Sequence, residues 1–208
     1  MPHPTIIRTE TADVDARLSE LGLTRAMIDE VRRVAVAARN SATGHHPRNH
    51  GGLMAFGEAV RALRDESSAT GFRAVWEGGL EICLNEALGI AILVGKGNAG
   101  TGKPDQHSST QYPRGPRGRE VLESNQMVLF DKQQPDRPAR RTWLLLIRQT
   151  DEHVWSELSL AAAVGEDGKV AVWDERIIFP PFDLGAPEPT ALSPTEPTPE
   201  IEISIVSR

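Results

Sequence analysis

Residues 80–95 read LEICLNEALGIAILVG and hold the clearest structural signal in the chain. Residues 80–84 alternate between apolar and other side chains, the period of a strand with one buried face. Residues 88–94 are almost continuously apolar, as expected of a central strand buried on both faces. Residues 72–76 alternate as well, and Gly78-Gly79 before the quoted stretch predicts a hairpin. The sheet is therefore expected to form around this segment.

Four further strands are predicted downstream, over 142–149, 154–160, 169–173 and 176–179. Their connections are short, and a tight turn is expected near Asp174. Short connections between such runs predict an antiparallel meander. Pro180-Pro181 is expected to end the folded region, because proline cannot donate a ladder hydrogen bond.

The N-terminal third has helical periodicity instead. Residues 11–39 predict two helices that are separated at Gly22, the second opening at Thr24. A third amphipathic helix follows, and its apolar face is formed by Leu53, Phe56, Val60 and Leu63. The fold class is therefore α+β, with N-terminal helices packed on a mostly antiparallel sheet and a C-terminal Pro/Glu-rich tail that ends in a candidate strand.

A chain of 208 residues suits one main domain. The expected division is a single α+β domain over 1–183, with its helical part at about 11–66 and its sheet at about 72–180. Residues 184–200 form a linker rich in Pro, Thr and Glu, and residues 201–208 form a candidate docking strand.

Composition indicates a cytoplasmic protein without membrane contact. Charged residues make up 25% of the chain, close to the globular average, which excludes wholesale disorder. No cationic and apolar leader opens the sequence, and the longest apolar runs are far below the ~20 residues that span a bilayer. The one cysteine, Cys83, cannot form an internal disulfide and is predicted to be a buried structural thiol.

Gly97–Lys103 (GNAGTGK) matches the GxxxxGK part of a phosphate-binding P-loop and follows the apolar strand, as that motif requires. Position 104 breaks the match, because proline stands where a Ser or Thr should hold magnesium. No helical period follows to direct amides at a phosphate. We therefore expect a glycine-rich structural or binding loop within the irregular segment 95–118, without nucleotide hydrolysis.

The middle of the chain is basic, although the whole chain carries a net charge of −6. Residues 95–141 hold nine basic and five acidic side chains. The candidate loop for binding an anion or a partner consists of Lys103, Tyr112, Arg114, Arg117, Arg119, Arg140 and Arg141. A solvated basic loop is the alternative, and nucleic acid is weakly indicated because a single aromatic residue accompanies the arginines.

Three histidines, His45, His46 and His50, form the candidate metal site. Neutral imidazole binds zinc and nickel, but Pro47 opposes a helix that would align the rings, and no acid or cysteine completes the set. A polar loop that leads into the third helix is the alternative. Apart from such a divalent metal no cofactor is expected, and no catalytic residue is assigned.

The last 24 residues, 185–208, are acidic, with four Glu and one Arg. The composition of residues 185–200 cannot bury enough apolar surface to become ordered alone. Ile201, Ile203 and Ile205 then alternate with polar residues, which predicts a strand that docks on a sheet edge of its own chain or of a partner. A homo-oligomer could form through this strand, and a frayed terminus is the alternative.

Several short runs resemble a pattern in uncharacterised bacterial proteins. They are residues 155–160 (WSELSL), 168–181 (GKVAVWDERIIFPP), Thr101-Gly102, Ser109-Thr110 and 113–116 (PRGP). The resemblance covers roughly residues 50–183. It implies a bacterial source and a shared fold, and it implies no activity, ligand or catalytic residue.

Two functions are consistent with these patterns. The first is a non-catalytic interaction or regulatory component of a bacterial multi-protein system, of a kind linked to mobile elements or phage defence. Its contact surfaces would be the 95–118 loop, the 131–141 linker and the C-terminal strand. The alternative is a metal-dependent enzyme or binder acting on a phosphate-containing or nucleic-acid substrate. The first is favoured because the sequence contains no complete catalytic set.

Overall fold

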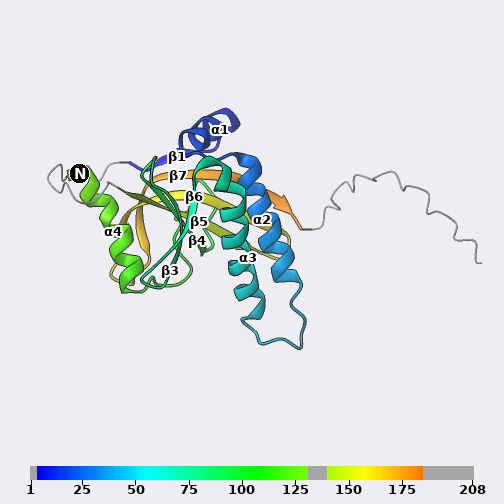
Figure 1. The fold of residues 1–208 in the computed structure, drawn as a ribbon. Helices are drawn as coiled ribbons and strands as arrows, with labels where there is room; N and C mark the ends of the chain where they lie inside the picture. The colour runs from blue at the N-terminus through cyan, green and yellow to red at the C-terminus, as the bar shows by residue number, and fades with distance from the viewer. Residues whose placement is uncertain (1–3, 131–139, 185–208) are drawn as a thin grey trace, which may run out of the picture.

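The computed structural model describes residues 4–130 and 140–184. Within these two ranges, four α-helices and seven strands follow one another (Figure 1). Their order is β1 (Ile6–Arg8), α1 (Thr11–Glu20), α2 (Arg25–Asn40), α3 (His50–Ser67), a 3-10 turn η1 (Ser68–Thr70), β2 (Arg73–Glu77), β3 (Leu80–Asn85), β4 (Ile90–Lys96), α4 (Pro116–Phe130), β5 (Arg141–Gln149), β6 (His153–Val164) and β7 (Val170–Asp183).

The strands form one sheet in the order β1-β7-β6-β5-β4-β3-β2. The pairs β4/β5 and β1/β7 are parallel, whereas the other neighbouring pairs are antiparallel. The predicted α+β class is confirmed, and the sheet is mixed. The parallel pair β4/β5 requires a crossover connection, and the chain makes it through α4.

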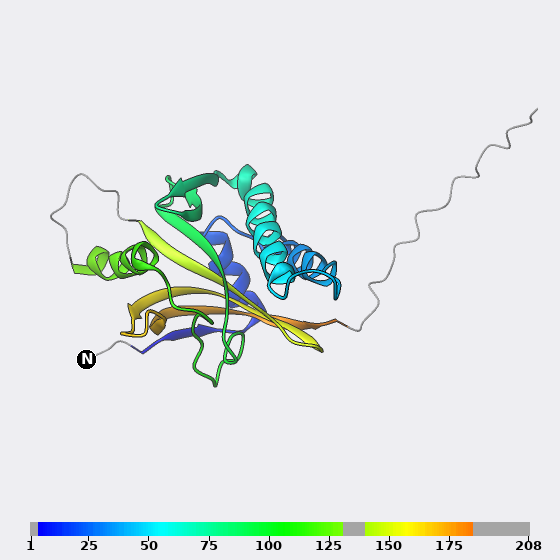
Figure 2. The same cartoon turned by 90° about the horizontal axis from the view of Figure 1, so that it is seen from below.

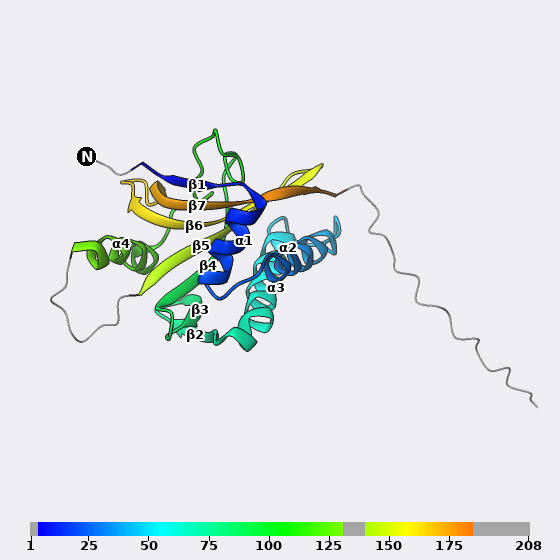
Figure 3. The ribbon, with the colours of Figure 1, turned by 90° about the horizontal axis from the view of Figure 1, so that it is seen from above.

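Both faces of the sheet are buried. On one face, a cluster of buried residues joins α1, α2 and α3 to Ile92 and Val94 of β4. On the other face, Leu122 of α4 belongs to a second cluster with Ala91 and Leu93 (Figures 2 and 3). Alternate residues of β4 thus pack into opposite cores, which explains why residues 90–94 of this strand are all apolar.

The last two predicted strands, 169–173 and 176–179, are one continuous strand, β7. Asp174 does not form a turn. It is the extra residue of a β-bulge, because Glu175 pairs with Leu160 while Trp173 pairs with the next residue, Ala161. A bulge interrupts the alternation of side chains and so resembles a turn in the sequence.

Pro180-Pro181 does not end the folded region as predicted, because β7 continues to Asp183. Among the described residues, β1 pairs with β7 only at residues 175–177. The outer edge of β7 is therefore open at the prolines, and an edge position tolerates a residue without an amide hydrogen.

The short strand β1 is not predicted from the sequence, because three residues are too few to show a period. Glu175 of β7, which is buried, connects this strand to α1. Arg8 Nε donates to Glu175 Oε1 at 2.6 Å, and Arg17 Nη2 donates to Glu175 Oε2 at 2.8 Å. Burial alone would raise the pKa of Glu175, but the hydrogen bonds from Arg17 and Arg8 outweigh it and lower the pKa.

Replacing Glu175 with glutamine is expected to lower the free energy of unfolding by about 2 kcal/mol at neutral pH, because charge-assisted hydrogen bonds are lost. The pKa of Glu175 in the folded chain lies below its ordinary value of 4.5, so its stabilisation is present above that pH and is lost as the pH falls through the folded-state pKa. In urea titrations, the difference in the free energy of unfolding between wild type and variant should shrink as the pH falls from about 6 to about 3. A difference that stays constant or widens would show that the ionised carboxylate contributes nothing.

Candidate interaction surfaces

The segment 97–115 after β4, here called the glycine loop, is closed by the side chain of Asn98. Asn98 Oδ1 accepts hydrogen bonds from the amides of Gly100 at 3.0 Å and Ser109 at 3.1 Å, and its Nδ2 donates to the carbonyl of His107 at 3.2 Å. Gly97 forms an antiparallel bridge with Thr110 at the neck of the loop. The loop passes over β6 and β7 (Figure 2).

Glycine at position 100 is required by space. A Cβ atom there would overlap the carbonyl oxygen of His107, which is a backbone atom. The polar side chains inside the loop, Thr101, Ser108, Ser109 and Thr110, are buried. Two hydrogen bonds fasten this interior to β7, one from Trp173 Nε1 to the Ser108 carbonyl at 2.8 Å and one from Ser109 Oγ to the Val170 carbonyl at 2.6 Å.

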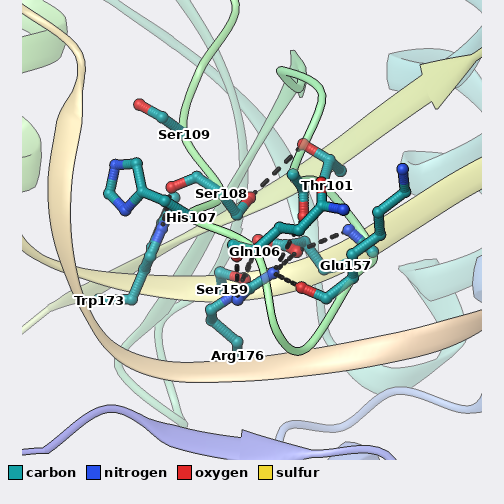
Figure 4. A network of polar contacts seen from close by, with 12 residues as sticks. Thr101, Gln106, His107, Ser108, Ser109, Glu157, Ser159, Trp173 and Arg176 are labelled. Carbon is teal, nitrogen blue, oxygen red and sulfur yellow. Dashed lines mark hydrogen bonds and ion pairs between the residues drawn. The ribbon is translucent and has the colours of Figure 1, made fainter.

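Under the glycine loop lies a buried ion pair between β6 and β7. Glu157 is 0% exposed and Arg176 is 4% exposed, and Arg176 Nη2 donates to Glu157 Oε2 at 2.6 Å. Arg176 also donates to the carbonyls of Lys103 at 3.0 Å and Gln106 at 3.2 Å, while the amide of Gly102 donates to Glu157 Oε2 at 2.9 Å (Figure 4). Each member of the pair therefore binds both its partner and the loop.

These contacts show how the glycine loop differs from a P-loop. In a P-loop the amides face a phosphate. Here the amide of Gly102 faces a carboxylate of the protein itself, Glu157. The Lys103 ammonium lies 5.2 Å from the ring centroid of Trp155 on β6, where it makes a cation–π contact. The Gly102 amide and the Lys103 ammonium thus both make contacts within the fold.

The seven residues predicted to bind an anion or a partner do not share one environment. Arg117 and Arg140 both form ion pairs with Glu77, at 2.5 Å and 3.2 Å. Arg119 donates to the carbonyl of Glu166 at 3.3 Å. The Glu77 carboxylate partly neutralises Arg117 and Arg140, and the binding role of all three arginines stays a prediction.

Of the remaining members of that set, Tyr112 and Arg141 are exposed and Arg114 is half-buried. Tyr112 is exposed, with the Lys96 ammonium 5.8 Å from its ring centroid. Arg141 is exposed at the first position of β5. Arg114 is half-buried, and burial lowers its pKa. No carboxylate in the part of the chain that the structure describes pairs with Arg114.

His45, His46 and His50 lie between α2 and the first turn of α3. The rings of His46 and His50 stack with their centroids 4.2 Å apart, and the amide of Thr43 donates to His46 Nδ1 at 2.9 Å. Stacking brings ring faces together and not ring nitrogens. Within residues 4–130 and 140–184 there is no group of three or more His, Cys, Asp or Glu side chains placed to hold a metal ion. Metal binding by these histidines stays a prediction.

Three other predictions have different outcomes. Cys83 is buried on β3 with its Sγ 3.3 Å from Ser67 Oγ, and burial raises the pKa of the thiol. No helix within the described ranges has the length and apolar character needed to cross a membrane. The docking strand with Ile201, Ile203 and Ile205, and most of the 131–141 linker, lie outside the described residues.

An open groove, here called the α2–α3 groove, runs between these two helices and the last residues of β4 and β5. Its lining is mainly small and apolar, with Ala35, Val36, Ala55, Phe56, Ala59 and Ile147. Of the described residues that line the groove, Arg39 and Lys96 are charged, and none is acidic. Among the described residues, neither of these two cations forms an ion pair.

The first half of α3, beside this groove, exposes part of the apolar face that the sequence predicts for this helix. Leu53 is 61% exposed and Phe56 is 44% exposed, whereas Val60 and Leu63 of the same stripe are buried. The connection between α2 and α3 lies away from the sheet, so the first half of α3 extends beyond it (Figure 1). Sequence reasoning missed this surface because an apolar stripe has the same pattern whether or not another element covers it.

Comparison with protein-family models finds no match, and neither does comparison with curated proteins or with solved structures. The resemblance of residues 50–183 to uncharacterised bacterial proteins therefore stays a prediction. What the protein does has to be inferred from its surfaces.

Proposed function

We propose that the protein is a non-catalytic interaction protein, an accessory or regulatory component of a multi-protein system, and that it binds another protein through the α2–α3 groove. The observation that carries this proposal is the exposure of Leu53, Met54 and Phe56 beside the groove. Exposed apolar patches of this kind often mark protein-binding sites. Aromatic residues and methionine are also enriched at the centres of protein interfaces.

The charge of the α2–α3 groove indicates what kind of segment it binds. The whole chain carries a net charge of −6, yet both charged lining residues, Arg39 and Lys96, are basic. A partner segment that combines apolar side chains with carboxylates would satisfy both features. Complementary charge of this kind speeds encounter and fixes the orientation of the partner.

The glycine loop supports the non-catalytic part of the proposal. The amide of Gly102 and the ammonium of Lys103 are the groups that gave this segment its likeness to a nucleotide-binding loop. Both make contacts within the fold, to Glu157 and to Trp155. Both contacts join the loop to β6.

Replacing Phe56 with glutamate in the full chain is expected to reduce co-purification of the partner from the producing cells about tenfold or more, because a carboxylate replaces an apolar contact. Phe56 is half-exposed, so the variant should fold, which circular dichroism checks. The measurement is quantitative mass spectrometry of the proteins retained by tagged wild type and variant.

The matched control is Trp76→Glu. Trp76 is 72% exposed on β2 and does not line the groove. A protein that is retained by wild type and by Trp76→Glu, but lost with Phe56→Glu, would support the proposal. Equal retention by both variants, or equal loss from both, would contradict it.

A further inference from the structure

We propose that the segment 201–206 (IEISIV) of the same chain occupies the α2–α3 groove until a partner displaces it. The inference rests on the proposed function in one respect, that this groove is a protein-binding surface. Three observations indicate this occupant. They are the place where the described chain ends, the lining of the groove and the sequence of the tail. It differs from docking on a sheet edge, which the alternation of isoleucines alone predicts.

The described chain ends beside the groove. The guanidinium of Arg32 on α2 lies 4.8 Å from the ring centroid of Phe182, near the end of β7. Val36, which lines the groove, is one helical turn further along α2. From the sheet side, the lining residue Gln149 pairs with Val154, which in turn pairs with Phe182. Phe182, two residues before the end of the described chain, therefore lies next to the groove.

The tail is long enough to reach. Sixteen residues, 185–200, separate the end of the described chain from the segment. Such a chain spans up to about 50 Å when extended. Tethering holds the segment at a local concentration in roughly the millimolar range, so even a weak contact fills the groove. The edge strand β2 lies five strand positions from β7, about 24 Å away, and is the more distant acceptor.

The side chains of the segment match the lining of the groove. In an extended chain its three isoleucines share one face, and they suit a surface made of alanine, valine and isoleucine side chains. Residues 185–208 carry a net charge of −3. This charge is opposite in sign to that of the two charged lining residues, Arg39 and Lys96, which form no ion pair with the described residues.

The segment would bind through its side chains and not as an added strand. The strands that contribute to the groove, β4 and β5, each have a neighbour on both sides in the sheet. Within the described sheet, neither strand therefore offers an open ladder edge. A partner that also covers Leu53 and Met54, which lie outside the lining, contacts more apolar surface than the tail and can displace it.

A nitroxide on the full-length Ile205→Cys variant tests the proposal. Cys83 is buried with a raised thiol pKa, so it does not compete for the label. In a dilute sample, the methyl signals of Ala55, Ala59 and Ile147 should lose most of their intensity relative to the sample with the reduced label. With Ile201→Asp and Ile203→Asp added as the control, these signals should recover while the rest of the spectrum stays unchanged.

Three results would overturn the proposal. Loss of intensity at Ala74 and Val75 instead would place the segment on the edge strand β2. If these signals lose intensity only when spin-labelled chains are mixed with isotope-labelled chains, the segment occupies the groove of a second copy of the chain. Loss at none of these positions would show that the tail does not dock.

Failure of this proposal can be told apart from failure of the proposed function. The Phe56→Glu comparison measures partner binding whether or not the tail enters the groove. If the tail does compete, Ile203→Asp in the full chain should retain a few-fold more partner than wild type. Suppose that partner retention depends on Phe56 but is the same for Ile203→Asp as for wild type. This result would support the proposed function and reject the tail as occupant.

Discussion

Replacing Arg176 with methionine is expected to lower the free energy of unfolding by about 3–5 kcal/mol, because a buried carboxylate loses its only cationic partner among the described residues. Glu157 is fully buried. Without Arg176 it keeps two neutral donors, the amide of Gly102 and the hydroxyl of Ser159. The loop carbonyls that Arg176 binds lose their donor as well. Urea unfolding of the full chain measures the loss.

The double variant Arg176→Met, Glu157→Gln separates the buried charge from the lost packing. Glutamine removes the uncompensated charge, so the double variant should recover much of the stability. The control Arg61→Met removes exposed ion pairs to Glu58 and Asp65 and should change stability little. If Arg176→Met cost no more than Arg61→Met, the buried pair would not be what holds the glycine loop.

Replacing Gly100 with alanine is expected to lower the free energy of unfolding by about 1–3 kcal/mol, as overpacking does elsewhere. The new Cβ would overlap the carbonyl oxygen of His107, and a backbone atom cannot rotate away. The loop would have to open, which also weakens the hydrogen bond from Arg176 to the Gly100 carbonyl. Thermal and urea unfolding both report the effect.

Gly115→Ala is the matched control within the same loop. A Cβ at position 115 meets nothing within 4 Å. Its substitution should be neutral or stabilising by about 0.5 kcal/mol, because alanine restricts the unfolded chain. Equal losses at positions 100 and 115 would mean that the loop needs flexible glycines and not the space at Gly100.

Much of the fold is predictable because local patterns determine it. The continuous apolar run in β4 predicts burial on two faces, and the two cores confirm it. The bulge at Asp174 could not be predicted, because its alternation defect looks like a turn unless the partner strand is known. The prolines of β7 mislead in the same way, since only the sheet order shows that they lie at an open edge.

The candidate site depends on contacts between residues far apart in the sequence. Nothing near Gly102 indicates that its amide faces Glu157, which lies 55 residues later. In the sequence alone, a P-loop and a structural glycine loop therefore have the same pattern. Only the position of β6 in the fold distinguishes them. Leu53 and Phe56 are recognised as helical and apolar, but whether the sheet covers them depends on how far α3 extends beyond it.

A photo-crosslinking amino acid at position 56 of the full chain, irradiated in the producing cells, is the most direct test of whether the α2–α3 groove binds a protein segment. The same amino acid at position 76, on β2 outside the groove, is the control. We predict covalent products from position 56, joined to another protein or to residues 201–206, at a yield well above that from position 76. Products from position 56 that are no more abundant than those from position 76 would contradict the binding role of the groove.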